Sequence, residues 1–184
     1  MTAVPRSPAV FLDKDGTLVE NVPYNVDPAK VRLAPGAAEC VSMLRAQGLR
    51  VIVVSNQPGL AMGLFRESSL LQVKAEIERQ LAQPLDGFYY CAHRPEAGCR
   101  CRKPSPGLLL RAAREHNLHL VGSWMVGDIL DDVEAGRRAG CRTVLVDNGS
   151  ETVWKRGKAR EPDVVVRDLA EAASRILAAA RAGA

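Results

Sequence analysis

Short apolar runs alternate with helical patterns along the chain, and this alternation constrains the fold more than any other feature. Residues 9–12 read Ala-Val-Phe-Leu, and comparable β-branched or apolar runs recur at 50–54, 87–90, 124–127, 143–146 and 163–166. The intervening segments carry apolar residues three and four positions apart, which predicts helices over 35–47, 67–81, 106–116, 131–139 and 169–180. Alternating strands and helices predict an α/β fold, a three-layer Rossmann-like parallel sheet with helices on both faces.

The length and composition predict one folded domain over residues 1–184. A chain of 184 residues, of which 47% are hydrophobic, is large enough to bury a core and unlike a disordered protein. It contains no internal repeat and no linker-like stretch. No apolar run reaches the length of a membrane span. Residues 1–8 read as a loose leader without the apolar region of a signal peptide, so we expect a cytoplasmic protein.

The charge pattern favours a small anionic substrate over a macromolecular partner. The formal net charge is +4, and the basic residues are spread out rather than gathered in one stripe. This distribution does not suggest nucleic-acid binding, and a modest positive excess suits a small phosphorylated metabolite. Because no long apolar stripe is left over, we expect a monomer.

The first apolar run ends abruptly in Asp13-Lys14-Asp15-Gly16-Thr17. Residues two apart on an extended chain share a face, so Asp13 and Asp15 should point the same way at the carboxyl end of the strand. Open α/β sheets bind their ligands at that edge. Two carboxylates this close repel unless a cation or a proton lies between them, and Mg2+ suits an all-oxygen site. The alternative is a polar turn, since Asp, Gly and Thr all favour turns.

Other predicted strands also end in polar groups. Ser55 follows the second run and Asp128 closes the fourth, while Lys103 stands at the start of a helix. Together with Asp13 and Asp15, these groups fit phosphoryl transfer. Asp13 would attack phosphorus, and Asp15 would protonate the leaving oxygen and later activate water. Ser55 would donate a hydrogen bond, Lys103 would supply a fixed cation, and Asp128 would complete a Mg2+ site.

These motifs resemble those of the haloacid dehalogenase superfamily of phosphatases. The segment Asp13 to Thr17 is similar to the nucleophile motif, and Ser55, Lys103 and Gly127-Asp128 follow in the order of the remaining motifs. The resemblance implies that Mg2+ is bound by the side chains of Asp13 and Asp128 and by the backbone carbonyl of Asp15. Two alternatives remain open: Asp128 as the N-cap of the next helix, and Lys103 as a solvated surface lysine.

A second cluster of candidate ligands lies in the segment Cys91-Ala92-His93 to Cys99-Arg100-Cys101. Three thiols and one imidazole within eleven residues predict a tetrahedral structural zinc site formed by Cys91, His93, Cys99 and Cys101. Such a zinc loop would hold the segment that presents Arg102 and Lys103. The alternative is a set of free buried thiols. Cys40 and Cys141 are expected in the core.

The zinc loop resembles that of a subgroup of the superfamily that acts on heptose bisphosphates or on histidinol phosphate. This subgroup has a short zinc-binding loop in place of a large cap domain, which implies an open site. The segments 56–63 and 88–95, together with Pro23-Tyr24, are more similar to the heptose-specific members. The resemblance implies substrate contacts from the following side chains: Asn21, Tyr24, Ser55, Asn56, Gln57, Arg102 and Lys103.

At two positions the sequence differs from the heptose-specific members, so the choice of substrate stays open. Ile129 follows Asp128 where some heptose-specific members have a lysine, and Met62 stands where an arginine is common. The expected activity is therefore a Mg2+-dependent phosphomonoesterase that removes the C7 phosphate of a heptose 1,7-bisphosphate, with histidinol phosphate or another small sugar phosphate as the alternative substrate. A different class of function is a non-catalytic interaction module whose loop is held by zinc. It would have lost Asp13, Asp15 or Asp128, and all three are present.

Overall fold

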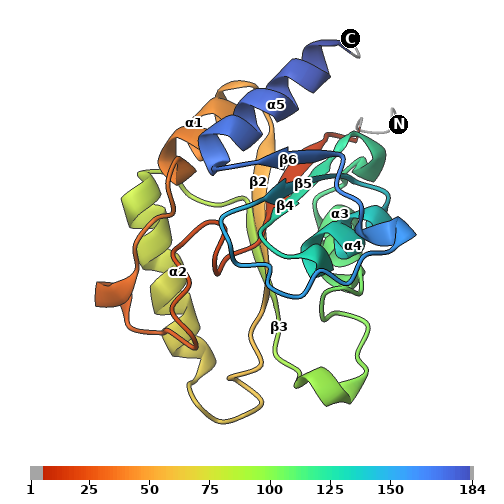
Figure 1. Cartoon of the computed structure of the whole chain (residues 1–184). Helices are drawn as coiled ribbons and strands as arrows, with labels where there is room; N and C mark the ends of the chain where they lie inside the picture. The colour runs from red at the N-terminus through yellow and green to blue at the C-terminus, as the bar shows by residue number, and fades with distance from the viewer. Residues whose placement is uncertain (1–5, 183–184) are drawn as a thin grey trace, which may run out of the picture.

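The computed structural model describes residues 6–182 and contains one six-stranded parallel sheet (Figure 1). The strand order is β3-β2-β1-β4-β5-β6, and every neighbouring pair is parallel. The strands are β1 (Ala9–Leu12), β2 (Arg50–Asn56), β3 (Gly87–Cys91), β4 (Trp124–Gly127), β5 (Arg142–Val146) and β6 (Val164–Val166). The predicted Rossmann-like parallel sheet is therefore confirmed.

The predicted helices are also present, with ends that differ by a few residues from the expected ones. They are α1 (Ala37–Ala46), α2 (Glu67–Leu81), α3 (Gly107–Glu115), α4 (Leu130–Ala139) and α5 (Leu169–Ala182). Four short 3-10 turns were not predicted, because three residues are too few to show a periodic pattern. They are η1 (Pro28–Lys30), η2 (Pro95–Ala97), η3 (Leu120–Gly122) and η4 (Lys158–Arg160).

Alternate residues of each central strand supply two separate cores, one on each face of the sheet. Val10 and Leu12 of β1 pack in a cluster with buried residues of α1, α2 and α5. Ala9 and Phe11 pack in a second cluster with buried residues of α3 and α4. This is the period-two alternation of a strand that is buried on both sides. It gives the three layers that Figure 1 shows, with α1 and α5 on one side of the sheet and α3 and α4 on the other.

The chain order changes direction between β1 and β4, which lie side by side in the middle of the sheet. Ligands bind at the carboxyl edge of open α/β sheets at this kind of switch point. Between β1 and α1, residues 13–36 contain only the turn η1, and between β3 and α3, residues 92–106 contain only η2. Within residues 6–182 there is thus no large cap domain over that edge.

Part of the predicted leader lies outside the described residues, namely 1–5. Ser7 forms a parallel bridge with Leu118, so the chain is already held against the domain before β1 begins. None of the described helices combines the length and the apolar character that a membrane crossing needs.

Candidate active site

A cavity of about 240 Å3 opens at the carboxyl edge of the sheet. Its lining comes from the segment after β1, the last two residues of β2, the segment between β4 and α4 with the first turn of α4, the segment before α3 and the loop after β5. The residues that line it are Asp13, Asp15, Asn21, Ser55, Asn56, Arg102, Lys103, Asp128, Ile129, Asp131 and Ser150. The structure therefore brings together the strand-end residues that the sequence singled out.

Asp13 lies at the centre of this group, in direct continuation of β1. Its backbone N–H donates to the Val126 carbonyl of β4 at 2.9 Å. Its side chain is 11% exposed and forms an ion pair with the Lys103 ammonium. The same ammonium lies 2.6 Å from Asp132 Oδ1 and donates to the Val54 carbonyl at 3.0 Å. With 3% exposure, Lys103 is a buried cation, so the surface-lysine alternative is wrong.

The turn after Asp15 brings the chain against Asp128. Thr17 Oγ1 donates to Asp128 Oδ1 at 2.8 Å. Gly16 has a φ of 86°, and a Cβ atom at this position would lie 2.1 Å from Asp128 Oδ2. Only glycine combines this backbone conformation with such a close approach. The motif is therefore more than a polar turn, because its geometry depends on a carboxylate from another strand.

The alternative of Asp128 as a helix N-cap is wrong. Helix α4 begins at Leu130, and its N-cap is Ile129. The side chain that reaches back to the Ile129 N–H belongs to Asp132, at 3.4 Å. Asp128 precedes the cap by one residue, so its carboxylate is free to face Thr17 and the cavity.

Asp15 is held by two donors. Gln57 Nε2 donates to Asp15 Oδ2 at 2.8 Å, and the Lys14 ammonium pairs with Oδ1. Gln57 Nε2 also lies 2.8 Å from Ser55 Oγ. The Lys14 side chain is only 2% exposed, whereas that of Asp15 is 30% exposed. The carboxylate is therefore fixed in orientation while it still faces the cavity.

Burial shifts the protonation of this cluster. Burial raises the pKa of Asp13 to about 7, and the neighbouring Lys103 ammonium opposes that rise. Burial also raises the pKa of Asp128 and of Asp132. Burial alone would lower the pKa of Lys103, but the carboxylates of Asp13 and Asp132 raise it. The Lys103 ammonium pairs with two of these carboxylates, those of Asp13 and Asp132, and a further cation would favour the ionised forms of all three.

The donor set fits a hard divalent cation. Asp13, Asp128 and Asp132 each offer a carboxylate oxygen, and these three oxygens lie within 4.8 Å of one another. Oxygen-only groups are the ligands that Mg2+ prefers. Asp132 belongs to this cluster although it was not among the predicted metal ligands.

The predicted zinc ligands also come together. The Sγ atoms of Cys91, Cys99 and Cys101 and a ring nitrogen of His93 lie within 4.8 Å of one another. Cys101 Sγ is 3.2 Å from both Cys91 Sγ and His93 Nδ1. Cys99 and Cys101 are half-buried rather than enclosed in the core. Three thiols and an imidazole gathered around one point fit a structural zinc ion. In contrast, Cys40 and Cys141 are buried core residues, as predicted.

The predicted substrate contacts divide into three groups. Five of them line the cavity: Asn21, Ser55, Asn56, Arg102 and Lys103. Asn56 also fixes the backbone of Lys103, accepting from its N–H at 3.0 Å and donating to its carbonyl at 3.1 Å. Gln57 does not line the cavity, and its side chain donates to the Asp15 carboxylate instead. Tyr24 is 52% exposed on the loop after β1 and is not among the lining residues.

Of the two departures, Ile129 lines the cavity, whereas Met62 is 40% exposed and does not. Arg102 differs from the other lining residues in one respect: its Nη1 atom is buried and has no hydrogen-bond partner within residues 6–182.

Sequence reasoning missed the roles of Asp132 and Lys14. Asp132 belongs to the pair Asp131-Asp132, but only the packing of α4 shows that one carboxylate faces inward and the other outward. The Asp132 side chain packs directly against the backbone of Gly127, where a Cβ atom would lie 2.2 Å from Asp132 Oδ2. Ser150 was missed as well, because its loop comes late in the chain and carries no strand-end signal.

Comparisons with known proteins agree with this geometry. A family model described as HAD-hydrolase-like matches residues 100–172. A D-glycero-beta-D-manno-heptose-1,7-bisphosphate 7-phosphatase of Pasteurella multocida is 37% identical over 173 residues, which cover 89% of this chain and 93% of that protein. The chain belongs to the HAD-like phosphatases.

Solved structures of HAD-like phosphatases share the fold over nearly the whole chain. The D,D-heptose 1,7-bisphosphate phosphatase of B. bronchiseptica, complexed with magnesium and phosphate, superimposes with a TM-score of 0.84 at 33% identity. That match covers 94% of this chain and 99% of the other. A HAD-like phosphatase from Mesorhizobium loti matches with a TM-score of 0.78 at 33% identity, over 96% of this chain and 87% of the other.

Proposed function

We propose that this HAD-like phosphatase removes the C7 phosphate of D-glycero-β-D-manno-heptose 1,7-bisphosphate. One structural observation carries the choice of a bisphosphate: Arg102 lines the same cavity as Asp13 and has a buried Nη1 atom without a partner among the described residues. A guanidinium with free N–H groups binds phosphate through two parallel hydrogen bonds. A substrate with two phosphates can thus offer one to Asp13 and the other to Arg102.

The first step is attack by Asp13 on phosphorus. A carboxylate oxygen of Asp13 forms the new bond, and the bond from phosphorus to the substrate oxygen breaks with its electron pair on that oxygen. Asp15 supplies the proton that the leaving oxygen needs. Lys103 remains a cation beside Asp13, so it favours the ionised nucleophile and offsets the charge of the transferring group.

The second step returns Asp13 to its starting state. Asp15, now ionised, accepts a proton from a water molecule that attacks the phosphoryl group on Asp13. The contacts from Lys14 and Gln57 hold Asp15 in one orientation for both steps. Ser55 lies next to Gln57 in the same cavity and supplies a hydrogen-bond donor to the phosphoryl oxygens.

We further propose that Asp13 and Asp128 hold Mg2+ through their side chains and Asp15 through its backbone carbonyl. When bound, Mg2+ would neutralise the charge of the carboxylates and of the phosphoryl oxygens. Asp132 pairs with the Lys103 ammonium and would hold that ammonium in place beside Asp13.

We also propose that Cys91, His93, Cys99 and Cys101 bind one zinc ion. The ligands are separated from Lys103 by as little as one residue, so closing the loop around zinc would fix the segment that presents Arg102 and Lys103.

The remaining proposals concern the whole protein: one domain over residues 1–184, which acts as a monomer in the cytoplasm on a small phosphorylated metabolite.

Histidinol phosphate is the alternative substrate, since the open cavity does not exclude its size. Its amine is cationic, and Arg102 would repel it. Ile129 at the rim of the cavity lacks a polar contact that a heptose hydroxyl could use. The two substrates therefore differ mainly in what they offer to Arg102.

The experiment is a comparison of Arg102→Ala with wild type, using phosphate release from the bisphosphate and from a monophosphate. We expect kcat/KM for the bisphosphate to fall by roughly 30- to 100-fold, about 2–3 kcal/mol, and that for the monophosphate to change much less. Arg175→Ala, in an exposed part of α5, is the matched control. An equal loss for both substrates would contradict a role of Arg102 in binding the second phosphate.

A further inference from the structure

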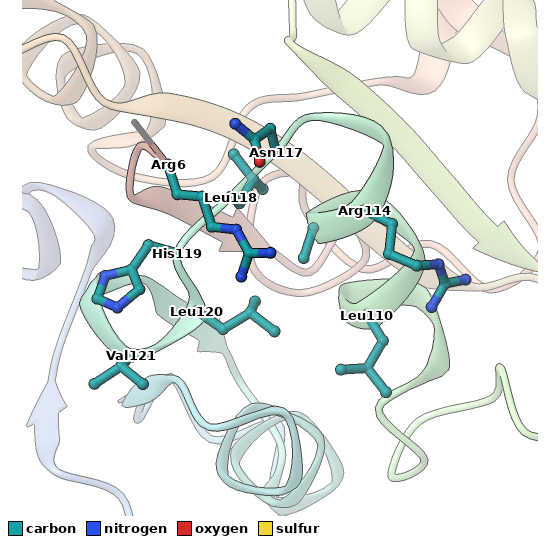
Figure 2. A pocket seen from close by; sticks show the side chains of 9 residues that line it. Arg6, Leu110, Arg114, Asn117, Leu118, His119, Leu120 and Val121 are labelled. Carbon is teal, nitrogen blue, oxygen red and sulfur yellow. The ribbon is translucent and has the colours of Figure 1, made fainter. Parts of the chain in front are cut away.

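A second cavity, of about 510 Å3, lies at the amino edge of the sheet, opposite the active site (Figure 2). It is formed by the segment before β1, the second half of α3 and the turn η3 before β4. The lining residues are Arg6, Leu110, Ala113, Arg114, Asn117, Leu118, His119, Leu120 and Val121. None of these residues belongs to the proposed active site or to the cysteine loop.

The floor of this cavity is apolar, and its rim is basic. Leu118 is buried, while Leu110 and Val121 leave 37% and 69% of their surface exposed. Arg6 and Arg114 form no ion pair with any residue in the range 6–182, and no Asp or Glu is among the lining residues. Because these two arginines have no acidic partner and no acidic residue lines the cavity, the cavity carries an excess of positive charge.

Arg6 is held in place at the rim by the backbone that follows it. Ser7 forms a parallel bridge with Leu118, and the His119 N–H donates to the Ser7 carbonyl at 2.9 Å. Figure 2 shows the Arg6 side chain extending over the cavity, with its guanidinium above Leu120. Arg6 is exposed, so its guanidinium is accessible to a ligand that enters the cavity from solvent.

We propose that this cavity binds an organic anion, a molecule in which an acidic group such as phosphate, sulfonate or carboxylate is attached to an apolar body. The acidic group would pair with Arg6, and the apolar body would cover Leu118 and Leu120 on the side toward Arg114, which lies across the cavity from Arg6 (Figure 2). A volume of about 510 Å3 is in the range of small-molecule sites. A simple inorganic anion would leave the apolar floor in water, and a neutral apolar molecule would leave the arginines without partners.

A neighbouring cavity extends this surface toward the cysteine loop. It has a volume of about 560 Å3, shares Leu110 and Arg114 with the first, and adds Arg100 and Arg111. Arg111 is engaged by Glu115 at 2.8 Å, whereas Arg100 has no acidic partner among the described residues. Longer anions could therefore extend along α3 beyond Arg114.

The probe for this site is 8-anilinonaphthalene-1-sulfonate, whose fluorescence rises in apolar surroundings. We expect saturable binding of one molecule per chain. N-phenyl-1-naphthylamine has the same ring skeleton without the sulfonate and should bind at least tenfold more weakly, and inorganic phosphate should not displace the sulfonate probe. Equal binding of the two naphthalene probes, or no saturable binding, would overturn the proposal.

Variants locate the site. Arg6→Gln should weaken binding of the sulfonate roughly five- to tenfold, as expected for a partly exposed charged contact, and Arg114→Gln, across the cavity, should weaken it less. Arg175→Gln on α5 is the matched control and should leave binding unchanged, as should Asp13→Asn in the active site. Unchanged binding in both cavity variants would overturn the proposal.

Amide chemical shifts give a second, independent measurement. In the intact 15N-labelled chain, the sulfonate should shift the amides of residues 6–7 and 110–121, and leave those of residues 13–17 and 126–129 unchanged. Shifts confined to the second group would place the probe in the active site and contradict the inference. Because no catalytic residue lines the cavity, the outcome does not depend on the proposed phosphatase substrate.

Discussion

Replacing Lys103 with methionine should destabilise the protein strongly. Methionine has a similar length but no charge, so the change removes the ammonium that lies between Asp13 and Asp132. Lys103 is 3% exposed, so water cannot take its place. The variant leaves buried carboxylates without their cation and the Val54 carbonyl without its donor.

The size of the effect follows from the burial of the partners. Removing one member of a buried ion pair costs about 3–5 kcal/mol, because the other charge is left unpaired. The whole free energy of unfolding of a domain is typically about 5–15 kcal/mol. We therefore expect Lys103→Met to lose about 3–5 kcal/mol at pH 7.5 in the absence of Mg2+.

The loss should depend on pH. In the folded protein the pKa of Asp13 and of Asp132 is raised above its ordinary value, and removing Lys103 raises both further. A carboxyl group with a raised pKa binds more protons when folded than when unfolded. Stability then falls as the pH rises from the ordinary pKa near 4 through the raised one. At pH 5 Asp13, with a pKa of about 7, can be neutral, and the raised pKa of Asp132 acts in the same direction, so the cost of the substitution should shrink.

Urea denaturation of wild type and Lys103→Met at pH 5 and pH 7.5 in EDTA measures this. Lys30→Met, at a lysine whose side chain is 67% exposed, is the control and should change the free energy of unfolding by less than about 0.5 kcal/mol. Lys103→Met combined with Asp132→Asn should recover part of the loss. A loss below about 1 kcal/mol at pH 7.5, or one that does not vary with pH, would refute the reasoning.

Three further predictions concern the catalytic acid and the metals. Asp15→Asn should lower kcat by roughly 10²- to 10⁴-fold and allow a phosphorylated Asp13 to accumulate, which mass spectrometry would detect; a wild-type rate would contradict the role of Asp15. Mg2+ should raise Tm more at pH 8 than at pH 5, because protons compete for carboxylates whose pKa is raised; an equal rise would count against this site. Metal analysis should find about one zinc per chain, and chelation of the zinc should lower Tm and activity together. Full activity without zinc would show that the cysteine loop does not position Lys103.

The fold was predictable because its signals are local. Most strands are runs of apolar residues that end in a polar group, and the parallel sheet brings those ends to one edge. The sequence was therefore enough to place Asp13, Asp15 and Asp128 together. The four zinc ligands lie within eleven residues, so a single loop holds them all.

The rest of the site depends on packing that no local pattern records. Asp131 and Asp132 are neighbours of the same type, yet α4 directs Asp132 into the core against Lys103 and leaves Asp131 to pair with Arg160 at 2.8 Å. Lys14 is buried because its ammonium meets Asp15, whereas a lysine in a polar segment would be expected to face water. Tyr24 shows the reverse: the resemblance implied that it contacts substrate, but its side chain is exposed and does not line the cavity.

The identity of the substrate is the central claim, and steady-state kinetics test it most directly. Wild type should be assayed with Mg2+ on D-glycero-β-D-manno-heptose 1,7-bisphosphate, histidinol phosphate and a panel of sugar monophosphates, with the products assigned by 31P NMR. We expect the highest kcat/KM for the heptose bisphosphate, with heptose 1-phosphate as the product. Release of the C1 phosphate, or equal or faster turnover of histidinol phosphate, would contradict it.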